Sequence, residues 1–327
     1  MTVTVCVARG AVVVDVPGLE LTQEDRERLC HPAVGGVILF ARNYASPVQL
    51  AALCAGIHAL RSPTLVVCVD HEGGRVQRFR DGFTCVPPMR ELGRRWDVDV
   101  AAAAAEAVRW GWTIASELRA QGVDLSFTPV LDVDFGHSSV IGDRALHRNP
   151  NAIAALAKAL IDGLHAGGMA SVGKHFPGHG FVAADSHTAL PVDERPLEAL
   201  AAADLVPFAV LAQHGLDAVM PAHVVYSAID PQPAGFSPFW LRETLRERYG
   251  FDGMIFSDDL TMAGAHAAGD IAERAGAANA AGCDVVLVCN DLPRADRLLD
   301  TWPSLPNPRL AARWRAMQGR ASARCPG

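Results

Sequence analysis

Short apolar runs recur along the whole chain, and each of them is bounded by Gly, Asp or Pro. Eight such runs occupy residues 11–16, 36–41, 65–70, 123–133, 170–176, 218–223, 253–258 and 284–290. Between them lie longer segments rich in Ala, Leu, Glu and Arg, at 47–61, 98–121, 151–166, 197–214, 237–249 and 271–281. Apolar β-branched runs that alternate with helical segments predict parallel strands buried on both faces.

An eightfold alternation of strand and helix closes most simply into a (β/α)8 TIM barrel, an α/β fold. A doubly wound open sheet is the alternative, because alternation by itself does not show closure. No Ser/Gly-rich linker or shift in composition marks a boundary, so we expect a single domain over residues 1–327. The tail after about residue 303 is expected to be a peripheral helix with a loose end.

Local residue pairs support the predicted helices. Ser46-Pro47 and Ser237-Pro238 each place a candidate N-cap before a proline suited to the first helical turn. Gly167-Gly168 can end the helix that precedes it.

Composition and charge narrow the class of protein. The 327 residues are 50% hydrophobic, and 36 Asp and Glu outnumber 29 Lys and Arg, which gives a formal net charge of −7. Such a chain buries a large core, which excludes intrinsic disorder and fibrous repeats. Because no long basic run is present, we expect no nucleic-acid partner.

The N-terminus and the cysteines bear on the cellular compartment and predict the cytoplasm. The first residues lack a basic segment and a small-residue cleavage site, and Asp15 interrupts the apolar stretch, so no signal peptide is expected. No apolar run reaches the ~18 residues that suggest a membrane span, so no membrane partner is expected. Eight cysteines without a C-x-x-C pair, several of them inside apolar runs, predict free thiols and a cytoplasmic location.

Ionisable residues gather where five consecutive strand runs end. In parallel barrels the chemistry takes place at the carboxyl ends of the strands. These ends carry Asp70, His71, Glu72, Arg75 and Arg78, then Asp132, Asp134 and Arg144, then Lys174, His175, His179, Asp185 and His187, then His223, and finally Asp258 and Asp259. A barrel with a purely structural role does not need this concentration of charge, so the sequence predicts an active site there.

Two neighbouring pairs suggest the kind of chemistry. Asp258 and Asp259 are adjacent in a predicted strand, so alternation predicts that only one of them faces the barrel mouth, where a carboxylate can attack a sugar carbon. Asp185 and His187 lie two residues apart in a loop, and a carboxylate beside an imidazole makes a general acid/base. An incidental Asp-His pair in a solvated loop is the alternative, and spacing does not decide between them.

Other enzyme classes remain open at this point. A divalent metal held by Asp70, His175, His179 and Asp258 would give a metal-dependent hydrolase. A Schiff base on Lys174 would give a lyase. A barrel that binds sugar without turning it over is the third alternative.

Six motifs resemble a known family. They are VDHEGGRVQRF (69–79), IGDRALH (141–147), GKHFPGHG (173–180), ADSH (184–187), MPAHVVYS (220–227) and GMIFSDDLTM (253–262). Together they resemble the bacterial β-N-acetylhexosaminidases of glycoside hydrolase family 3, of the NagZ type. The similarity covers nearly the whole chain, and KHFPGHG followed by DSH and then SDDL is a highly specific order.

The resemblance implies a single TIM barrel that removes terminal β-linked N-acetylglucosamine from muropeptides during peptidoglycan recycling. It implies Asp258 as the nucleophile, His187 as the general acid/base and Asp185 as the residue that orients His187. Retention of the anomeric configuration through a glycosyl-enzyme is implied, with no metal and no cofactor. The partner is then a small GlcNAc-containing molecule, and we expect a monomer.

The resemblance also implies the residues that bind the sugar, which are Asp70, Arg78, Arg144, Lys174 and His175. Their chemistry fits that role, since a carboxylate accepts hydrogen bonds from sugar hydroxyls and the cations donate them.

One residue departs from the family pattern. His71 stands where the family's D-Q-E-G-G stretch has glutamine. We therefore expect a titratable group beside Asp70 that alters sugar affinity with pH.

Overall fold

The structure is a computed structural model that describes residues 5–183, 190–303 and 307–322. Its centre is an eight-stranded parallel sheet in the order β8-β5-β3-β2-β15-β14-β11-β9. These strands are β2 (Val12–Asp15), β3 (Val34–Leu39), β5 (Val66–Val69), β8 (Leu125–Ser126), β9 (Val172–Phe176), β11 (Ala218–Pro221), β14 (Met254–Asp259) and β15 (Val285–Val288). Each of the eight predicted runs overlaps one of them.

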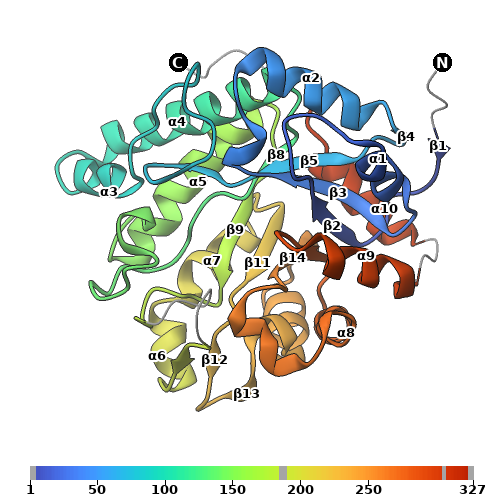
Figure 1. The fold of residues 1–327 in the computed structure, drawn as a ribbon. Helices are drawn as coiled ribbons and strands as arrows, with labels where there is room; N and C mark the ends of the chain where they lie inside the picture. Colours follow the sequence, from blue (N-terminus) through green and yellow to red (C-terminus); the bar gives the residue numbers. More distant parts are fainter. Residues whose placement is uncertain (1–4, 184–189, 304–306, 323–327) are drawn as a thin grey trace.

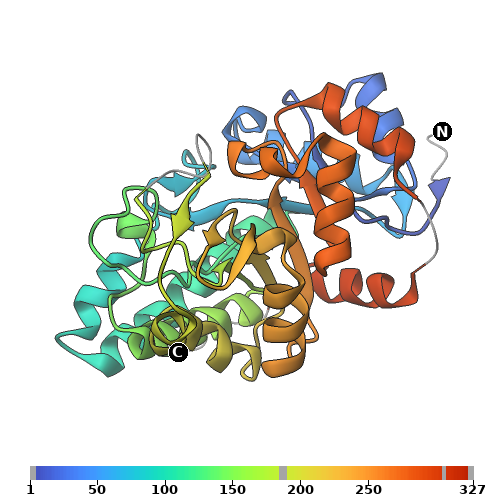
Figure 2. The ribbon, with the colours of Figure 1, turned by 90° about the horizontal axis from the view of Figure 1, so that it is seen from below.

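The sheet closes on itself. Parallel bridges join Leu125 to Ala170 and Val130 to Lys174, so the segment around β9 returns beside the segment around β8. Figures 1 and 2 show the helices arranged around the outside of the sheet. The barrel prediction is therefore confirmed, and the open doubly wound sheet is excluded.

The helices follow the strands in the expected alternation. They are α1 (Gln23–Cys30), α2 (Pro47–His58), α3 (Arg90–Trp96), α4 (Val100–Ala120), α5 (Pro150–Ala166), α6 (Leu197–Ala202), α7 (Leu205–Ala212), α8 (Ile271–Ala281), α9 (Leu292–Thr301) and α10 (Pro308–Met317), with a π-helix at Phe239–Arg248. The short 3-10 helices are η1 (Ala41–Asn43), η2 (Gly142–Arg144), η3 (Ala234–Phe236) and η5 (Ala263–Ala268). The short strands outside the barrel are β1 (Val5–Cys6), β4 (Arg61–Ser62), β6 (His71–Gly73), β7 (Val76–Gln77), β10 (Val192–Asp193), β12 (Val225–Tyr226) and β13 (Asp230–Pro233).

Capping explains where two predicted helices begin. Ser46 accepts a hydrogen bond from Gln49 N, and Pro47 occupies the first turn of α2. Ser237 Oγ likewise accepts from Trp240 N ahead of the π-helix. The prediction of one continuous helix at 197–214 was wrong. Ala203 leaves helical geometry and separates α6 from α7.

Side chains alternate between two apolar layers. Val13 points into the barrel, while Val12 and Val14 point outward against the helices. On β14, Phe256 points inward and Ile255 outward. This alternation is the reason for the unbroken apolar runs in the sequence, because both faces of every strand are buried.

Helix α10 lies against the amino-terminal end of the barrel. Trp314 is 1% exposed, its Nε1 donates to Gly10 O at 2.8 Å, and its ring meets Phe256 edge-on with centroids 5.9 Å apart. Leu310 and Met317 join the same apolar cluster inside the barrel. The described part of the tail is thus packed into the core, which differs from the peripheral helix that we expected.

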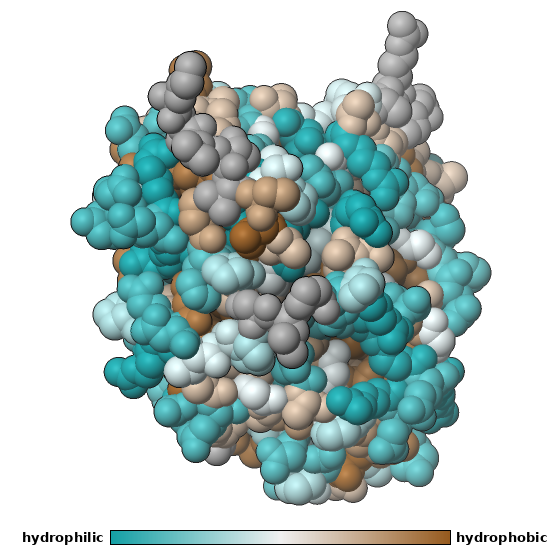
Figure 3. All heavy atoms as spheres, turned by 90° about the vertical axis from the view of Figure 1, so that its right-hand side faces the viewer, coloured by the Kyte–Doolittle hydropathy of each residue, from teal (hydrophilic) through white to brown (hydrophobic). Residues whose placement is uncertain are grey.

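Few large apolar side chains are exposed among the described residues. The face drawn in Figure 3 is mostly hydrophilic, with apolar side chains in small groups. None of the described helices has the length and apolar composition needed to cross a membrane. All cysteines among the described residues are free, and Cys54, Cys68, Cys283 and Cys289 are buried.

Candidate active site

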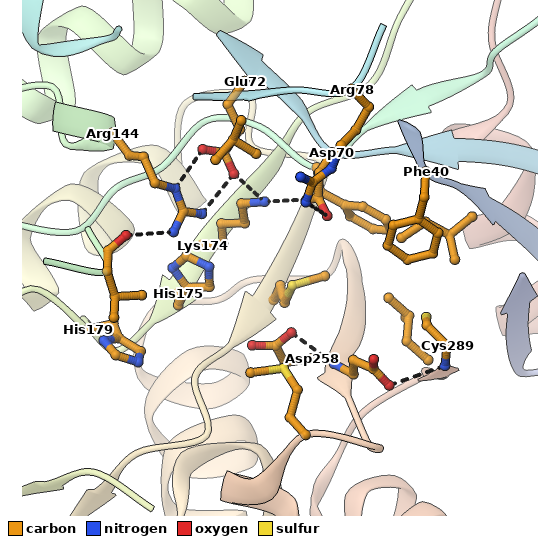
Figure 4. Close-up of a pocket in the computed structure, with 18 of the residues that line it drawn as sticks. Phe40, Asp70, Glu72, Arg78, Arg144, Lys174, His175, His179, Asp258 and Cys289 are labelled. Atoms are coloured by element: carbon orange, nitrogen blue, oxygen red, sulfur yellow. Dashed lines mark hydrogen bonds and ion pairs between the residues drawn. The ribbon is translucent and has the colours of Figure 1, made fainter. Parts of the chain in front are cut away.

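A cavity of about 400 Å³ lies at the carboxyl ends of the barrel strands. Its polar lining comes from the ends of β5, β9 and β14 and from the loops that follow β5 and β8 (Figure 4). Apolar side chains that belong to the same lining are Ile38, Phe40, Phe127, Met220, Met262 and Leu287. A volume of this size falls within the range of about 300–1,000 Å³ that small-molecule sites occupy.

Glu72 connects the cations on one wall of the cavity. Arg144 donates to both Glu72 oxygens, from Nε to Oε2 and from Nη2 to Oε1, each at 2.8 Å. Lys174 Nζ lies 2.7 Å from Glu72 Oε1 and 2.7 Å from Asp70 Oδ1. Arg78 approaches the other oxygen of Asp70 at 3.6 Å. Two carboxylates and three cations therefore form one continuous network (Figure 4).

Opposite charges keep Glu72 and Lys174 of this network ionised. Burial raises the pKa of Glu72, but Arg144 and Lys174 outweigh burial and hold that pKa well below its ordinary value. Burial lowers the pKa of Lys174, but Asp70 and Glu72 outweigh it and hold that pKa above its ordinary value. Lys174 is an ammonium ion at neutral pH and has no lone pair for attack on a carbonyl, which argues against a Schiff base.

Asp132 holds His175 against the same wall. Asp132 Oδ2 lies 2.7 Å from His175 Nδ1, and its Oδ1 accepts from the backbone N of His175 at 3.2 Å and of His179 at 2.7 Å. Burial raises the pKa of the fully buried Asp132, but His175 outweighs burial and brings that pKa below its ordinary value. Because a carboxylate only accepts, Nδ1 of His175 carries a proton, and the ring is fixed in one orientation.

Both Asp258 and Asp259 line the cavity, so the prediction that only one faces the barrel mouth was wrong. Phe256 pairs with Val285 and Asp259 pairs with Leu287, so three steps on β14 match two on β15. Such a bulge re-aims the side chains that follow it, and simple alternation no longer applies.

The two carboxylates differ in their partners. Asp259 accepts from Thr261 N, Thr261 Oγ1 and Cys289 N, whereas Asp258 Oδ1 accepts from Asp259 N at 2.8 Å. Burial raises the pKa of Asp259 to about 7 against the opposing effect of these hydrogen bonds. Figure 4 shows Asp258 directed into the cavity, across from Lys174 and His175.

The structure brings most of the predicted site residues into one cavity: Asp70, Arg78, Arg144, Lys174, His175 and Asp258. Asp185 and His187 lie outside the described residues, so their predicted roles stay predictions.

Two residues of the site received no role from sequence reasoning. Glu72 and Asp132 were recognised as charged residues near strand ends, but only the folded structure shows what they bind. The spacing could have pointed to Glu72. It lies two residues after Asp70, and side chains two apart in an extended segment point to the same side, here toward the barrel mouth.

His71 does not line the cavity, which argues against the expectation that it alters sugar affinity with pH. Its side chain is 1% exposed and packs against Phe79 and Phe83, with ring centroids 5.9 and 5.6 Å away. Burial, with Arg80 and Arg78 nearby, lowers the pKa of His71 to about 4. His71 is therefore neutral above about pH 5.

The alternative metal set is not assembled. Within 5–183, 190–303 and 307–322, no three His, Cys, Asp or Glu side chains lie together in a way that could hold a metal ion.

Comparison with known proteins adds independent findings. Residues 9–308 match the model of the glycosyl hydrolase family 3 N terminal domain. A β-hexosaminidase of Methylobacillus flagellatus is 59% identical over 290 residues, which are 89% of this chain and 83% of that protein. A β-hexosaminidase of Neisseria meningitidis is 57% identical over 95% of this chain and 87% of its own length.

A solved structure is similar throughout. NagZ from Neisseria gonorrhoeae, crystallised in complex with N-trifluoroacetyl-D-glucosamine, superposes with a TM-score of 0.92 at 53% identity. The match covers 97% of this chain and 92% of that one. A β-N-acetylhexosaminidase from Beutenbergia cavernae has a TM-score of 0.80 at 29% identity, over 94% of this chain and 95% of its own.

Proposed function

Because this chain belongs to glycosyl hydrolase family 3 and is a β-hexosaminidase of that family, we propose that it is a retaining exo-β-N-acetylglucosaminidase. Its substrate is a peptidoglycan fragment, GlcNAc-1,6-anhydro-MurNAc with or without peptide, from which it removes the terminal non-reducing GlcNAc. The reaction serves peptidoglycan recycling in the cytoplasm, and the free thiols support that compartment. The N-trifluoroacetyl-D-glucosamine held by the gonococcal relative supports the choice of sugar.

One observation carries the proposal. Asp258 lies in the same cavity as the network of Asp70, Lys174 and Arg144 and is directed across it (Figure 4). A sugar bound to that network lies between the network and Asp258, where its anomeric carbon is within reach of a carboxylate. The alternative metal set also spans both walls, but no such group of three ligands is assembled among the described residues.

The first wall binds and orients the sugar. Asp70 accepts hydrogen bonds from sugar hydroxyls, Arg78, Arg144 and Lys174 donate them, and Nε2 of His175 accepts one because the ring proton is on Nδ1. Since Glu72 and Asp132 hold three of these side chains before substrate arrives, little side-chain freedom is lost on binding.

Asp258 then performs the covalent step. Its Oδ attacks C1 of the sugar, the C1–O bond to the leaving group breaks, and the leaving oxygen takes a proton from His187. In the second half, His187 removes a proton from water, the water oxygen bonds to C1, and the Asp258 carboxylate leaves. Two displacements at C1 retain the anomeric configuration.

Asp185 orients His187 in this scheme. A histidine is suited to the task because its unperturbed pKa of ~6.5 already lies near the working pH.

A fluorinated N-acetylglucosaminide with a good leaving group tests the covalent step. We expect peptide mass spectrometry to find the sugar on Asp258, and NMR to show that the released GlcNAc is first formed as the β-anomer. A label on Asp259, or an inverted product without any label, would exclude the mechanism. Asp259→Asn is the matched control, since it preserves the labelled peptide and removes only the neighbouring acid.

The substrate class needs its own measurement. We expect kcat/KM for GlcNAc-1,6-anhydro-MurNAc to exceed that for chitobiose, because the proposal makes the anhydro sugar the natural leaving group. A preference for chitobiose would keep the hexosaminidase activity but reject the peptidoglycan substrate.

A further inference from the structure

Asp259 lies beside the proposed nucleophile, and three separate elements hold it. Its backbone N donates to Asp258 Oδ1 at 2.8 Å. Its side chain connects β14 to the end of β15, since Oδ1 accepts from Cys289 N at 3.2 Å. Its backbone O lies 3.1 Å from Nε2 of His223, which follows β11. The position of the Asp258 carboxylate thus depends on a residue that is fixed by two neighbouring strands.

The donors around Asp259 are arranged unequally. Oδ1 receives two backbone N–H groups, from Thr261 at 3.0 Å and from Cys289 at 3.2 Å. Oδ2 has a hydroxyl partner, Thr261 Oγ1, at 2.8 Å. Of the two oxygens, only Oδ2 faces a group that can accept as well as donate, so a proton on a neutral Asp259 would sit on Oδ2 and point to Thr261 Oγ1.

The Thr261 hydroxyl has a second neighbour that distinguishes the two protonation states. Its Oγ1 lies 3.1 Å from Cys289 O as well as 2.8 Å from Asp259 Oδ2. A hydroxyl has one proton to donate. If Asp259 is ionised, that proton points to Oδ2, and Cys289 O goes without it. If Asp259 is neutral, its own proton goes to Thr261 and the Thr261 proton goes to Cys289 O, so both contacts are hydrogen bonds.

We propose that Asp259 is a positioning residue for the nucleophile and acts in its neutral form, sharing its proton through Thr261 with the carbonyl of Cys289. This inference rests on the proposed role of Asp258. Burial, which raises the pKa of Asp259 to about 7, agrees with it. The arrangement leaves one negative charge, on the residue that attacks, because two adjacent carboxylates do not both ionise readily.

Among the largest influences on the pKa of Asp259, the one charged group is Asp258, which raises that pKa, and none is a cation. Burial raises the pKa of the Cys289 thiol well above its ordinary value, so this thiol stays neutral. The groups that approach from the surrounding elements are Asp258 on β14, Cys289 after β15, His223 after β11, His266 of η5 near Thr261 O, and Arg274 of α8, which donates to Leu260 O.

The test compares isosteric and truncated variants. Asn places an acceptor and a donor where the neutral acid has them, whereas Ala removes both. With an aryl N-acetylglucosaminide, we expect Asp259→Asn to lose less than about tenfold in kcat, and Asp259→Ala to lose about 100-fold with KM changed less than about threefold. A similar loss for both variants, or a small loss for Ala, would overturn the proposal.

The pH profile gives a readout that a purely structural role would not move. The acid limb of kcat/KM reports ionisation of Asp258 in the free enzyme. If Asp259 is already neutral in that pH range, the acid limb of kcat/KM for Asp259→Asn coincides with that of the wild type. A shift of the limb to lower pH by more than about half a unit would show that a negative charge was removed, and the neutral form would be rejected.

Thr261 provides a second, independent pair of variants in case Asp259 variants fold poorly. We expect Thr261→Ser to lose less than about threefold in kcat and Thr261→Val about tenfold, since only Ser keeps the hydroxyl. Equal activity of the two variants would overturn the hydrogen-bond chain. The fluoroglycoside label on Asp258 is a separate measurement. If Asp258 is not labelled, the proposed function is rejected. If Asp258 is labelled but Thr261→Ser and Thr261→Val are equally active, only this inference is rejected.

Discussion

Arg144 meets Glu72 with two parallel hydrogen bonds of 2.8 Å each, and both side chains are almost completely buried. Such a bidentate pair fixes the guanidinium plane as well as its distance. The same carboxylate also receives Lys174, so one buried acid positions two of the proposed sugar ligands.

Glu72→Gln should therefore weaken sugar binding without a direct contact being lost. We expect KM and the Kd for GlcNAc to rise about tenfold, because a neutral amide leaves two buried cations poorly compensated. Calorimetric titration with GlcNAc measures this effect. Glu91→Gln on α3, which breaks an exposed pair with Arg94, is the control and should change nothing. Unchanged Kd in Glu72→Gln would show that Arg144 and Lys174 keep their positions without it.

Asp132→Asn should reduce both stability and sugar affinity. The carboxylate accepts from three N–H groups, and an amide turns one of its acceptors into a donor that faces another donor. We expect the free energy of unfolding in urea to fall by about 3 kcal/mol. Asp162→Asn removes an exposed ion pair with Lys158 and should cost less than about 1 kcal/mol. Equal losses in the two variants would contradict the role given to Asp132.

His71 should affect stability through pH but leave sugar binding alone. Its pKa is lowered from 6.5 to about 4, so the unfolded chain binds the extra proton between these values. The contribution of neutral His71 is present above about pH 6.5 and is lost as pH falls toward 4. We expect the stability of wild type relative to His71→Gln to fall by about 3 kcal/mol over that window.

Urea unfolding at several pH values measures this difference for His71. The pH dependence of KM should coincide in wild type and His71→Gln, because the ring lies among Phe79 and Phe83 rather than in the cavity. A divergence of the two KM profiles would restore the role in sugar binding that the structure argues against.

Trp314→Ala should destabilise the barrel from the end opposite the cavity. The variant loses a fully buried ring and its hydrogen bond to Gly10 O, and we expect a cost of about 4 kcal/mol in the free energy of unfolding. Trp314→Phe keeps most of the ring volume and should cost less. KM at a temperature where both variants are folded should match the wild type, and a raised KM would indicate coupling along the barrel axis.

The barrel fold and the location of the candidate site could be predicted from the sequence because they depend on periodicity and chain order. Eight apolar runs alternating with helices admit few topologies, and parallel strands bring their carboxyl ends to one side. Asp70, Lys174 and Asp258 each follow or end such a run, so their convergence needed no side-chain detail.

The finer arrangement depended on contacts between residues far apart in the sequence. A register shift between β14 and β15 brought Asp259 to the cavity beside Asp258, and no local pattern marks that shift. The Glu72–Arg144 pair joins residues 72 positions apart.

By itself, the sequence determined that this protein is an α/β barrel with charged residues at its mouth and the motifs of one hydrolase family. The tertiary structure alone decided that Glu72 holds Arg144 and Lys174, that His71 packs in an aromatic cluster, and that α10 packs against the end of the barrel. The physical reason is that periodicity encodes which face of an element is buried. Partners of a buried charge are decided only when the sheet closes and must satisfy every polar group inside it.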